Sequence, residues 1–230
     1  MKTLTALIPF FNEERTIVEL IDQLNALPKG ILTECVFIND GSTDSSSQLL
    51  SKALADVDFK SQIIAKANGG KASAIKEGAT ALITTHVVIL DSDLELATSD
   101  IERLWQVVQS GENDFVFGYR AFLAHSSFTY RYSRGNQVIS SIYGILFNEV
   151  ITDIMCGYKL VPSETLQSLP YKYKHFGLEI EIPMQMWLSH QRPFEVDVAY
   201  RARTRAQGKS ISVKDAFAVI ASMAVFITSL

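Results

Sequence analysis

Short apolar runs alternate along the first half of the chain with longer stretches whose apolar residues recur every three or four positions. The runs cover residues 4–10, 33–40, 61–67, 86–91 and 113–120, and helical spacing fills residues 12–27, 42–57, 70–83 and 99–111. In the first helical stretch, Ile17, Leu20, Ile21 and Leu24 share one face. Strands that alternate with helices in this way predict an α/β fold with a mostly parallel, twisted sheet covered by helices on both faces.

Four of the predicted strands run directly into polar loops. These loops read "PFFNEE", "NDGSTD", "KANGGK" and "DSDLE". Each alone is typical of a solvated loop, and residues 42–44 could simply cap the next helix, although capping leaves Asp40 unexplained. Because ligands of open α/β sheets bind beyond the carboxyl ends of the strands, four such loops at one edge predict a binding site.

The loop "DSDLE" indicates a divalent cation. Side chains alternate along an extended chain, so Asp91 and Asp93 are predicted to lie on the same side, and Glu95 continues that parity. Carboxylates held together repel unless a positive charge lies between them. Mg²⁺ or Mn²⁺ prefers such oxygen ligands and often bridges them to substrate phosphates. We therefore expect a metal site at Asp91, Asp93 and Glu95.

Composition restricts the class of protein. Of the 230 residues, 47% are hydrophobic and 20% are charged, which is enough for the core of one domain. The net charge of −4 argues against a nucleic-acid partner. Cys35 and Cys156 lie far apart in apolar surroundings, which predicts free buried thiols in a reducing compartment. Acidic residues follow the first apolar run too soon for a secretory signal, so we expect a cytoplasmic location.

Several segments together resemble the family 2 glycosyltransferases, which are inverting enzymes with the GT-A fold. "IPFFNEE", "FINDGSTD", "NGGKASAIKEGA" and "VVILDSDLE" carry the resemblance in this order, and "DIMCGYKL", "FGLEIEI" and "RTRAQGKSI" continue it. The branch that transfers a sugar to polyprenyl phosphate, such as the dolichyl-phosphate mannose or glucose synthases, is the most similar. Glu95 stands where that branch often has Gln, and Asn39 stands where the family usually has Asp.

The resemblance implies roles on the donor side, with UDP or GDP as the nucleotide. Asp40 would contact the base, Asp91 the sugar, and Asp93 the metal-bound diphosphate. The remaining nucleotide-sugar residues would be Pro9, Asn12, Glu13, Gly70 and Lys71. Basic residues near the end of the chain would close over the diphosphate, unless they form a solvated loop: Arg203, Arg205 and Lys209.

The second half of the chain is expected to build the acceptor side. Arg120 ends the fifth strand, and together with Arg131 or Arg134 it could grip an acceptor phosphate. The resemblance puts Asp153 near the transferred sugar, and of Glu179 and Glu181 only Glu179 is favoured to reach the site. A phosphate acceptor needs hardly any general base, whereas a sugar hydroxyl would need Asp153 or Glu179. The acceptor, polyprenyl phosphate or a glycan, therefore stays open.

A second class of function competes with glycosyl transfer. Nucleotidyltransferases and nucleotide-binding modules can share a similar sheet. Sugar nucleotidyltransferases usually place a glycine-rich basic loop after the first strand, whereas "PFFNEE" has no glycine and two acids. This difference favours a glycosyltransferase.

The predicted organisation is one GT-A domain over residues 1–212, followed by an apolar helix over 213–230. Residues 1–119 would form the nucleotide-sugar half and 120–212 the acceptor half. The last 15 residues carry no charge, fewer than the about 20 that span a bilayer. The helix could belong to the core, contact a second copy or another partner, or lie on a membrane surface. A polyprenyl acceptor would favour a peripheral location on the cytoplasmic side of the membrane.

Overall fold

A seven-stranded sheet forms the centre of the molecule in the computed structural model, which describes residues 1–121, 130–173, 177–201 and 213–228. The strand order is β3-β2-β1-β4-β6-β5-β7. The strands are β1 (Leu4–Phe10), β2 (Glu34–Asn39), β3 (Lys60–Ala65), β4 (His86–Ile89), β5 (Val116–Arg120), β6 (Lys159–Pro162) and β7 (Phe194–Val198).

Most neighbouring strands are parallel, as the alternating pattern predicts. The exception is β6, which lies between β4 and β5 and runs antiparallel to both, whereas β7 pairs in parallel with β5. The direction of connection reverses at β1, with β2 on one side of it and β4 on the other. The crevice beyond β1 and β4 is therefore the place where a sheet of this kind binds ligands.

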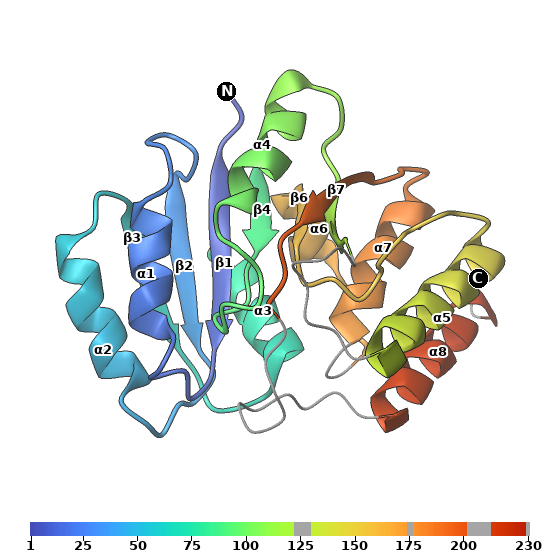
Figure 1. Ribbon diagram of the computed structural model, residues 1–230, viewed down its shortest axis with the longest axis horizontal. Coiled ribbons are helices and arrows are strands. Elements are labelled where there is room, and N and C mark those ends of the chain that lie inside the picture. Colours follow the sequence, from blue (N-terminus) through green and yellow to red (C-terminus); the bar gives the residue numbers. More distant parts are fainter. Residues whose placement is uncertain (122–129, 174–176, 202–212, 229–230) are drawn as a thin grey trace.

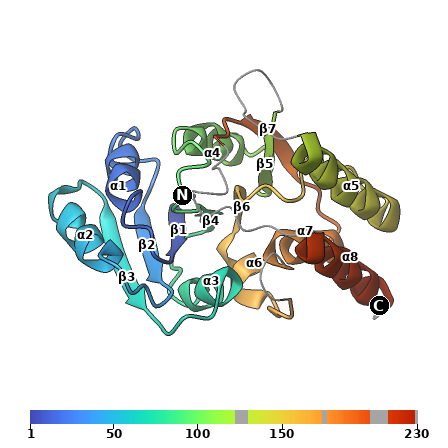
Figure 2. The same ribbon diagram turned by 60° about the horizontal axis from the view of Figure 1, so that its bottom comes forward.

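Helices cover both faces of the sheet (Figures 1 and 2). One face carries α1 (Ile17–Asn25), α2 (Ser46–Ala53) with the short 3₁₀ helix η1 (Leu54–Asp56), and α4 (Asp100–Ser110). The other carries α3 (Lys71–Ala79), α6 (Ser163–Ser168) and α7 (Leu178–Leu188), and beyond them α5 (Tyr130–Phe147) and α8 (Val213–Thr228).

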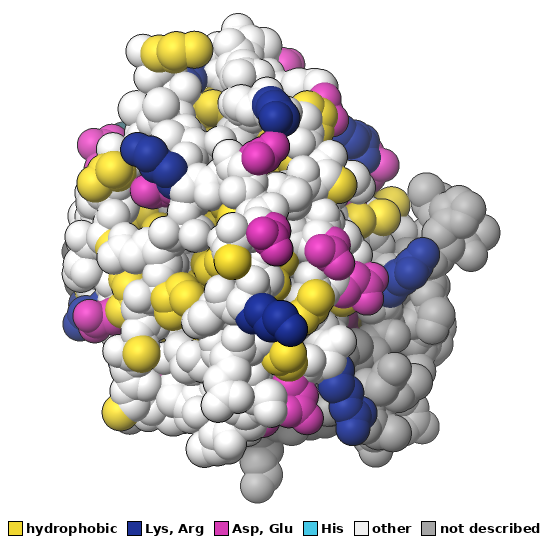
Figure 3. Space-filling view, turned by 90° about the vertical axis from the view of Figure 1, so that its left-hand side faces the viewer, with side chains coloured by type: hydrophobic (Ala, Val, Ile, Leu, Met, Phe, Trp, Pro, Cys, Tyr) yellow, Lys and Arg dark blue, Asp and Glu magenta, His cyan; other side chains and the backbone are white. Residues whose placement is uncertain are grey.

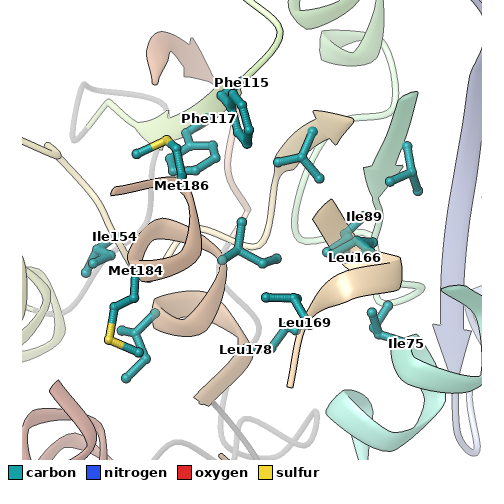
Figure 4. Close-up of a cluster of buried hydrophobic side chains, with 14 of the residues drawn as sticks. Ile75, Ile89, Phe115, Phe117, Ile154, Leu166, Leu169, Leu178, Met184 and Met186 are labelled. Atoms are coloured by element: carbon teal, nitrogen blue, oxygen red, sulfur yellow. The ribbon is translucent and has the colours of Figure 1, made fainter. Parts of the chain in front are cut away.

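The alternation of side chains along the strands creates two hydrophobic cores. In β1, Leu7 packs in the core under α3 and its neighbour Ile8 packs in the core under α1. Figure 4 shows the first core, where Met186 from α7 lies beside Phe117 from β5, and Met184 from α7 belongs to the same core. The predicted free, buried state of both cysteines is also confirmed.

The C-terminal helix α8 packs against α5 with one side only. Val219 and Met223 are buried in the first core, whereas Phe217 is 69% exposed and Val225 is 59% exposed. Part of this helix therefore serves the core, and part of it presents apolar side chains outward. Among the described helices, none combines the length and the hydropathy needed to cross a bilayer.

The end of the molecule that carries β3 and α2 bears charge of both signs. In the described part of the face drawn in Figure 3, Lys and Arg side chains are interspersed with Asp and Glu side chains. Neither sign of charge dominates on the described part of this face.

Candidate active site

The loops after β1 and β2 are joined by hydrogen bonds, which fixes one side of the crevice. The Thr43 N–H donates to Asn12 Oδ1 at 2.8 Å, and the Glu13 N–H donates to Ser46 Oγ at 2.8 Å. Asn12 adopts a left-handed backbone, with φ of 55°. The contacts of Asn12 therefore hold the two loops together, and Asn12 lines neither of the two cavities described below.

The buried carboxylate of Asp40 holds the loop after β3 in place. Oδ1 accepts hydrogen bonds from Lys66 Nζ at 2.8 Å and from the Gly69 N–H at 3.0 Å, and Oδ2 accepts one from the Gly70 N–H at 2.7 Å. Gly70 has a φ of 84°, which favours glycine there. Since each carboxylate oxygen accepts two hydrogen bonds, Oδ2 keeps a position for a ligand.

Lys71 links the first half of the chain to the second. Its ammonium lies 2.7 Å from Asp91 Oδ1 and 3.0 Å from Glu179 Oε1. Burial disfavours the charged form of Lys71, but the two carboxylates outweigh burial and hold its pKa above the ordinary value. Oε2 of Glu179 is buried and has no hydrogen-bond partner among the described residues. The ion pairs thus bring together three residues that the sequence assigned to the site.

A glycine allows a second close approach to Asp91. A Cβ on Gly157 would lie 2.6 Å from Asp91 Oδ2, closer than non-bonded atoms tolerate. The segment "DIMCGYKL" therefore packs directly on the carboxylate, so the position of Asp91 depends on the absence of a side chain at residue 157.

The segment Asp91–Glu95 is a turn rather than an extended strand. Strand β4 ends at Ile89, Leu94 has a φ of 59°, and the Glu95 N–H donates to Asp93 Oδ1 at 3.0 Å. The expected alternation of side chains therefore does not apply here, and Glu95 Oε2 instead accepts a hydrogen bond from the Tyr200 hydroxyl.

No group of three or more His, Cys, Asp or Glu side chains in the described part of the chain is arranged to hold a metal ion. The residues still fit a cation that brings its own phosphate ligands. Asp93 and Asp91 line one cavity, and Mg²⁺ is commonly held by one or two carboxylates, with phosphates and water completing its shell. The predicted metal site is therefore incomplete without a ligand.

Two cavities meet at the carboxyl edge of the sheet. The first, of about 310 Å³, is lined by most of the predicted donor residues, which are Pro9, Glu13, Asp40, Lys71, Asp91 and Asp93. The rest of its lining consists of Phe10, Phe11, Ala74 and Ser92. The second, of about 880 Å³, shares Phe11, Asp40 and Lys71 with the first and adds Asn68, Gly69, Gly70, Ala72, Ser73, Lys76, Tyr171 and Tyr173. Gly70 thus lines the second cavity only.

Arg120 and Asp153 form a buried bidentate ion pair. The guanidinium donates Nε–H to Asp153 Oδ2 at 2.6 Å and Nη2–H to Oδ1 at 2.8 Å. Burial alone would lower the pKa of Arg120, but Asp153 raises it above its ordinary value. The Arg120 guanidinium also lies 5.1 Å from the centre of the Tyr200 ring. Arg120 thus contacts Asp153, a residue that was expected at the sugar, and Arg120 lines neither of the two cavities.

The other predicted acceptor residues are described only in part. Arg134 lies in the first half of α5 and donates to Gln137 Oε1 at 3.0 Å. Nothing is described of the Arg131 side chain, and Arg203, Arg205 and Lys209 lie outside the described residues. Glu181 lies on α7 away from Lys71 and accepts a hydrogen bond from the Lys172 N–H, so of the two glutamates only Glu179 contacts the donor residues.

Sequence reasoning missed Lys159, a fully buried lysine in β6. Its ammonium donates to the carbonyls of Ile154 at 3.0 Å and Cys156 at 2.6 Å, and burial lowers its pKa. It therefore fixes the turn that carries Asp153 and Gly157. The available signal was a single lysine inside the apolar run "CGYKLVP".

Comparison with known proteins shows similarity at the level of family. Residues 5–169 match the family model described as glycosyl transferase family 2. An uncharacterized protein from Methanocaldococcus jannaschii is 24% identical over 186 residues, which cover 74% of this chain and 78% of that protein. An undecaprenyl-phosphate 4-deoxy-4-formamido-L-arabinose transferase from Yersinia pestis is 36% identical over 117 residues, or 48% of this chain. The matched region spans only 35% of that transferase.

Solved structures share the fold along the whole chain. Glucosyl-3-phosphoglycerate synthase from Mycobacterium tuberculosis, in complex with Mn²⁺, UDP and glucosyl-3-phosphoglycerate, aligns with a TM-score of 0.74 at 18% identity, covering 100% of this chain and 81% of that one. The same enzyme with Mg²⁺ and UDP aligns with a TM-score of 0.73 at 19% identity, covering 99% and 79%. The predicted GT-A fold is thereby confirmed.

Proposed function

The chain belongs to glycosyl transferase family 2, and from this premise we propose that it transfers a sugar, with inversion, from a nucleoside-diphosphate sugar to polyprenyl phosphate. The observation that carries the proposal is the crevice beyond β1 and β4, where Glu13, Asp40 and the pair Asp91–Lys71 line one cavity with Asp93. These groups can hold a ribose, a base, a sugar and a metal-bound diphosphate in one continuous ligand.

The donor lies along this crevice with its sugar at the ion-paired end. Glu13 accepts from the ribose hydroxyls, and Asp40 Oδ2 accepts from the base. Lys71, Asp91 and Glu179 orient the sugar hydroxyls, since Glu179 Oε2 is buried and has no partner in the described structure. A Mg²⁺ or Mn²⁺ ion at Asp93 neutralises the charge that develops on the departing nucleoside diphosphate.

The contacts of the two candidate bases favour a phosphate acceptor. Asp153 is buried and bonded through both oxygens to Arg120, and Glu179 is paired with the ammonium of Lys71. These contacts occupy the Asp153 oxygens and Glu179 Oε1, which a general base would need for taking a proton. A phosphate is already ionised at neutral pH, so it attacks the anomeric carbon without giving up a proton. The Yersinia pestis relative acts on undecaprenyl phosphate by its name, which agrees with this choice.

A sugar hydroxyl is the second candidate acceptor, and one observation supports it. Glu179 Oε2 has no described partner, so it could take the proton of an attacking hydroxyl. The M. tuberculosis structure contains glucosyl-3-phosphoglycerate, which is not a polyprenyl product. In this case the chain would extend a glycan or modify a small acceptor.

A polyprenyl acceptor places the enzyme at the cytoplasmic membrane surface. The outer sides of α5 and α8 fit that location, because Ile145 is 82% exposed on α5 while Phe217 and Val225 are exposed on α8. Apolar side chains of this kind enter the membrane interface without spanning it. In this arrangement residues 1–119 form the donor half and residues 120–212 form the acceptor half.

The decisive experiment combines binding and turnover. Calorimetric titration with UDP and GDP, with and without Mn²⁺, reports the base and the need for metal. Purified chain is then incubated with the matching nucleotide sugars and with either polyprenyl phosphate or an oligosaccharide, and the anomeric configuration of the product is read by NMR. Inverted transfer to polyprenyl phosphate is the expected result. Transfer to the oligosaccharide alone would favour the second acceptor, and no transfer despite nucleotide binding would indicate a binding module.

A further inference from the structure

The larger cavity has a wall that belongs to the second half of the chain. Tyr171 and Tyr173 come from the segment between α6 and α7, whereas Phe11, Asp40 and the segment Asn68–Ser73, which includes the start of α3, come from the first half. The cavity therefore begins at the nucleotide loops and ends at two tyrosines. Neither tyrosine belongs to the donor residues considered so far.

A buried carboxylate holds the backbone of this wall. Glu181 is 3% exposed, and its Oε1 accepts a hydrogen bond from the Lys172 N–H at 3.0 Å. Burial raises the pKa of Glu181, and the nearby backbone amides of this turn oppose that shift. Tyr171 adopts a φ of 51°, an unusual conformation for a residue of its size. The hydrogen bond from Lys172 therefore ties the middle of this turn to the buried carboxylate on α7.

Further contacts hold the two rings. The Tyr171 hydroxyl donates to the Leu166 carbonyl at 2.9 Å, and Lys76 Nζ lies 5.9 Å from the centre of its ring. A Cβ on Gly177 would lie 2.2 Å from the Cβ of Tyr173, so the position of Tyr173 requires glycine at residue 177. Several independent contacts therefore position Tyr171 and Tyr173, which together are called the tyrosine wall. A loop that only faced solvent would not require such contacts.

The lining of this cavity matches the chemistry of a planar heterocycle. Phe11, Tyr171 and Tyr173 offer aromatic faces for stacking, while Asn68 and Asp40 offer hydrogen-bonding groups for the edge of a ring. The smaller cavity, with Glu13, Asp91 and Asp93, suits hydroxyls and a metal-bound diphosphate instead. Asp40 lines both cavities, so a base bound to its Oδ2 would lie at the entrance of the larger one.

We propose that the larger cavity holds the nucleobase of the donor, and that Tyr171 and Tyr173 determine how strongly each base is bound. This inference rests on the proposed function. It adds that the second half of the chain contributes to donor recognition, with Glu181 and Gly177 as positioning residues for the tyrosine wall.

The test compares ligands with and without a base. UDP, GDP and inorganic pyrophosphate, each with Mn²⁺, are titrated calorimetrically into the unaltered chain and into Tyr173→Ala, Tyr173→Phe and Tyr171→Ala. Lys172→Ala is the matched control, because it lies in the same turn but does not line the cavity. We expect Tyr173→Ala and Tyr171→Ala to weaken the preferred nucleotide about 10-fold, the size of one lost stacking contact. The affinity of these variants for pyrophosphate should stay near that of the unaltered chain. Tyr173→Phe and Lys172→Ala should also bind the preferred nucleotide with nearly the affinity of the unaltered chain.

Two further variants test positioning while both rings remain. Gly177→Ala and Glu181→Gln should weaken nucleotides but not pyrophosphate, with circular dichroism confirming that they fold. Unchanged nucleotide affinity in Tyr173→Ala and Tyr171→Ala, or an equal loss of pyrophosphate affinity, would overturn the assignment. If Tyr173→Ala and Tyr171→Ala instead bound nucleotides normally but had a raised KM for the acceptor, the larger cavity would be assigned to acceptor binding. If the unaltered chain bound no nucleotide, the proposed function itself would fail.

Discussion

Four carboxylates of the site each contact a basic side chain in the ligand-free structure. Lys71 contacts both Asp91 and Glu179. Lys66 contacts Asp40, and Arg120 contacts Asp153. Removing one partner of a buried pair is costly, because it leaves an uncompensated charge. These residues therefore keep their positions in the free protein, which reduces the reorganisation that binding and catalysis require.

Asp93 is the residue on which metal dependence should rest. We expect Asp93→Ala to lower turnover about 1,000-fold, because several kcal/mol of leaving-group stabilisation would be lost. Nucleotide affinity should at the same time become independent of Mn²⁺ in calorimetric titration. Glu95→Gln is the control: since Glu95 contacts Tyr200, this variant should keep its Mn²⁺ dependence. Full activity of the unaltered chain in excess EDTA would contradict the metal role.

Gly157 should matter for the donor rather than for the fold. A Cβ at this position would displace Asp91 Oδ2, and misplacement of a reacting group by about 1 Å can cost 100-fold in rate. We therefore expect Gly157→Ala to reduce kcat/KM for the nucleotide sugar by about 10- to 100-fold. Gly135→Ala, in α5, is the control, because a Cβ there meets no described atom within 4 Å. Equal activity of the two variants in steady-state kinetics would show that Asp91 tolerates the shift.

His86 should make stability depend on pH. Burial lowers the pKa of His86 below its ordinary value of 6.5, although the Asp114 carboxylate opposes this effect. Below pH 6.5 the unfolded chain therefore binds more protons at this residue than the folded one, so folding stability is lost as the pH falls. Thermal unfolding measured on both sides of pH 6.5 should show a smaller loss in His86→Gln. If the melting temperature of His86→Gln changed with pH as it does in the unaltered chain, the loss of stability at low pH would belong to other groups.

At the scale of helices, α8 has one side buried in the core and another side exposed. Met223 is buried against the core that α5 shares, whereas Phe217 and Val225 lie on the exposed side. A helix that served the core alone would carry polar residues outward. The exposed apolar residues therefore agree with the proposed contact with a membrane surface.

The two sides of α8 should respond differently to substitution. We expect Phe217→Ser with Val225→Ser to abolish co-sedimentation with anionic liposomes while the melting temperature changes little. Met223→Ala should do the opposite, costing about 2–5 kcal/mol of stability through the cavity it leaves, while the protein that remains folded still binds liposomes. Negligible liposome binding by the unaltered chain would remove the membrane from the proposal and favour a sugar acceptor.

At the scale of the whole molecule, the two halves of the chain meet through few but charged contacts at the crevice. Lys71 of the first half reaches Glu179 of the second, and strands β4 and β6 join the halves within one sheet. A ligand that lies in the crevice touches both halves at once. In the proposed arrangement, residues 120–212 form the acceptor half and also contribute Glu179 and the two tyrosines to donor binding.

The sequence predicted the first five strands and the helices between them, because local periodicity determines such elements. It did not predict β6, where a buried lysine interrupts an apolar run of only four strand residues, Lys159–Pro162. It also gave the wrong geometry for Asp91 and Asp93, since β4 ends two residues before the first aspartate. The pair Arg120–Asp153 depends on tertiary contacts between distant segments, which no local pattern reports.

The antiparallel strand β6 has a consequence for synthesis of the protein on the ribosome. Strand β5 leaves the ribosome before β6, yet β6 is the strand that connects it to β4. Until residues 159–162 and then 194–198 emerge, β5 has no neighbour on either edge, and unpaired edges recruit other chains. The nascent chain should therefore be most dependent on chaperones while the segment between β5 and β7 is being translated.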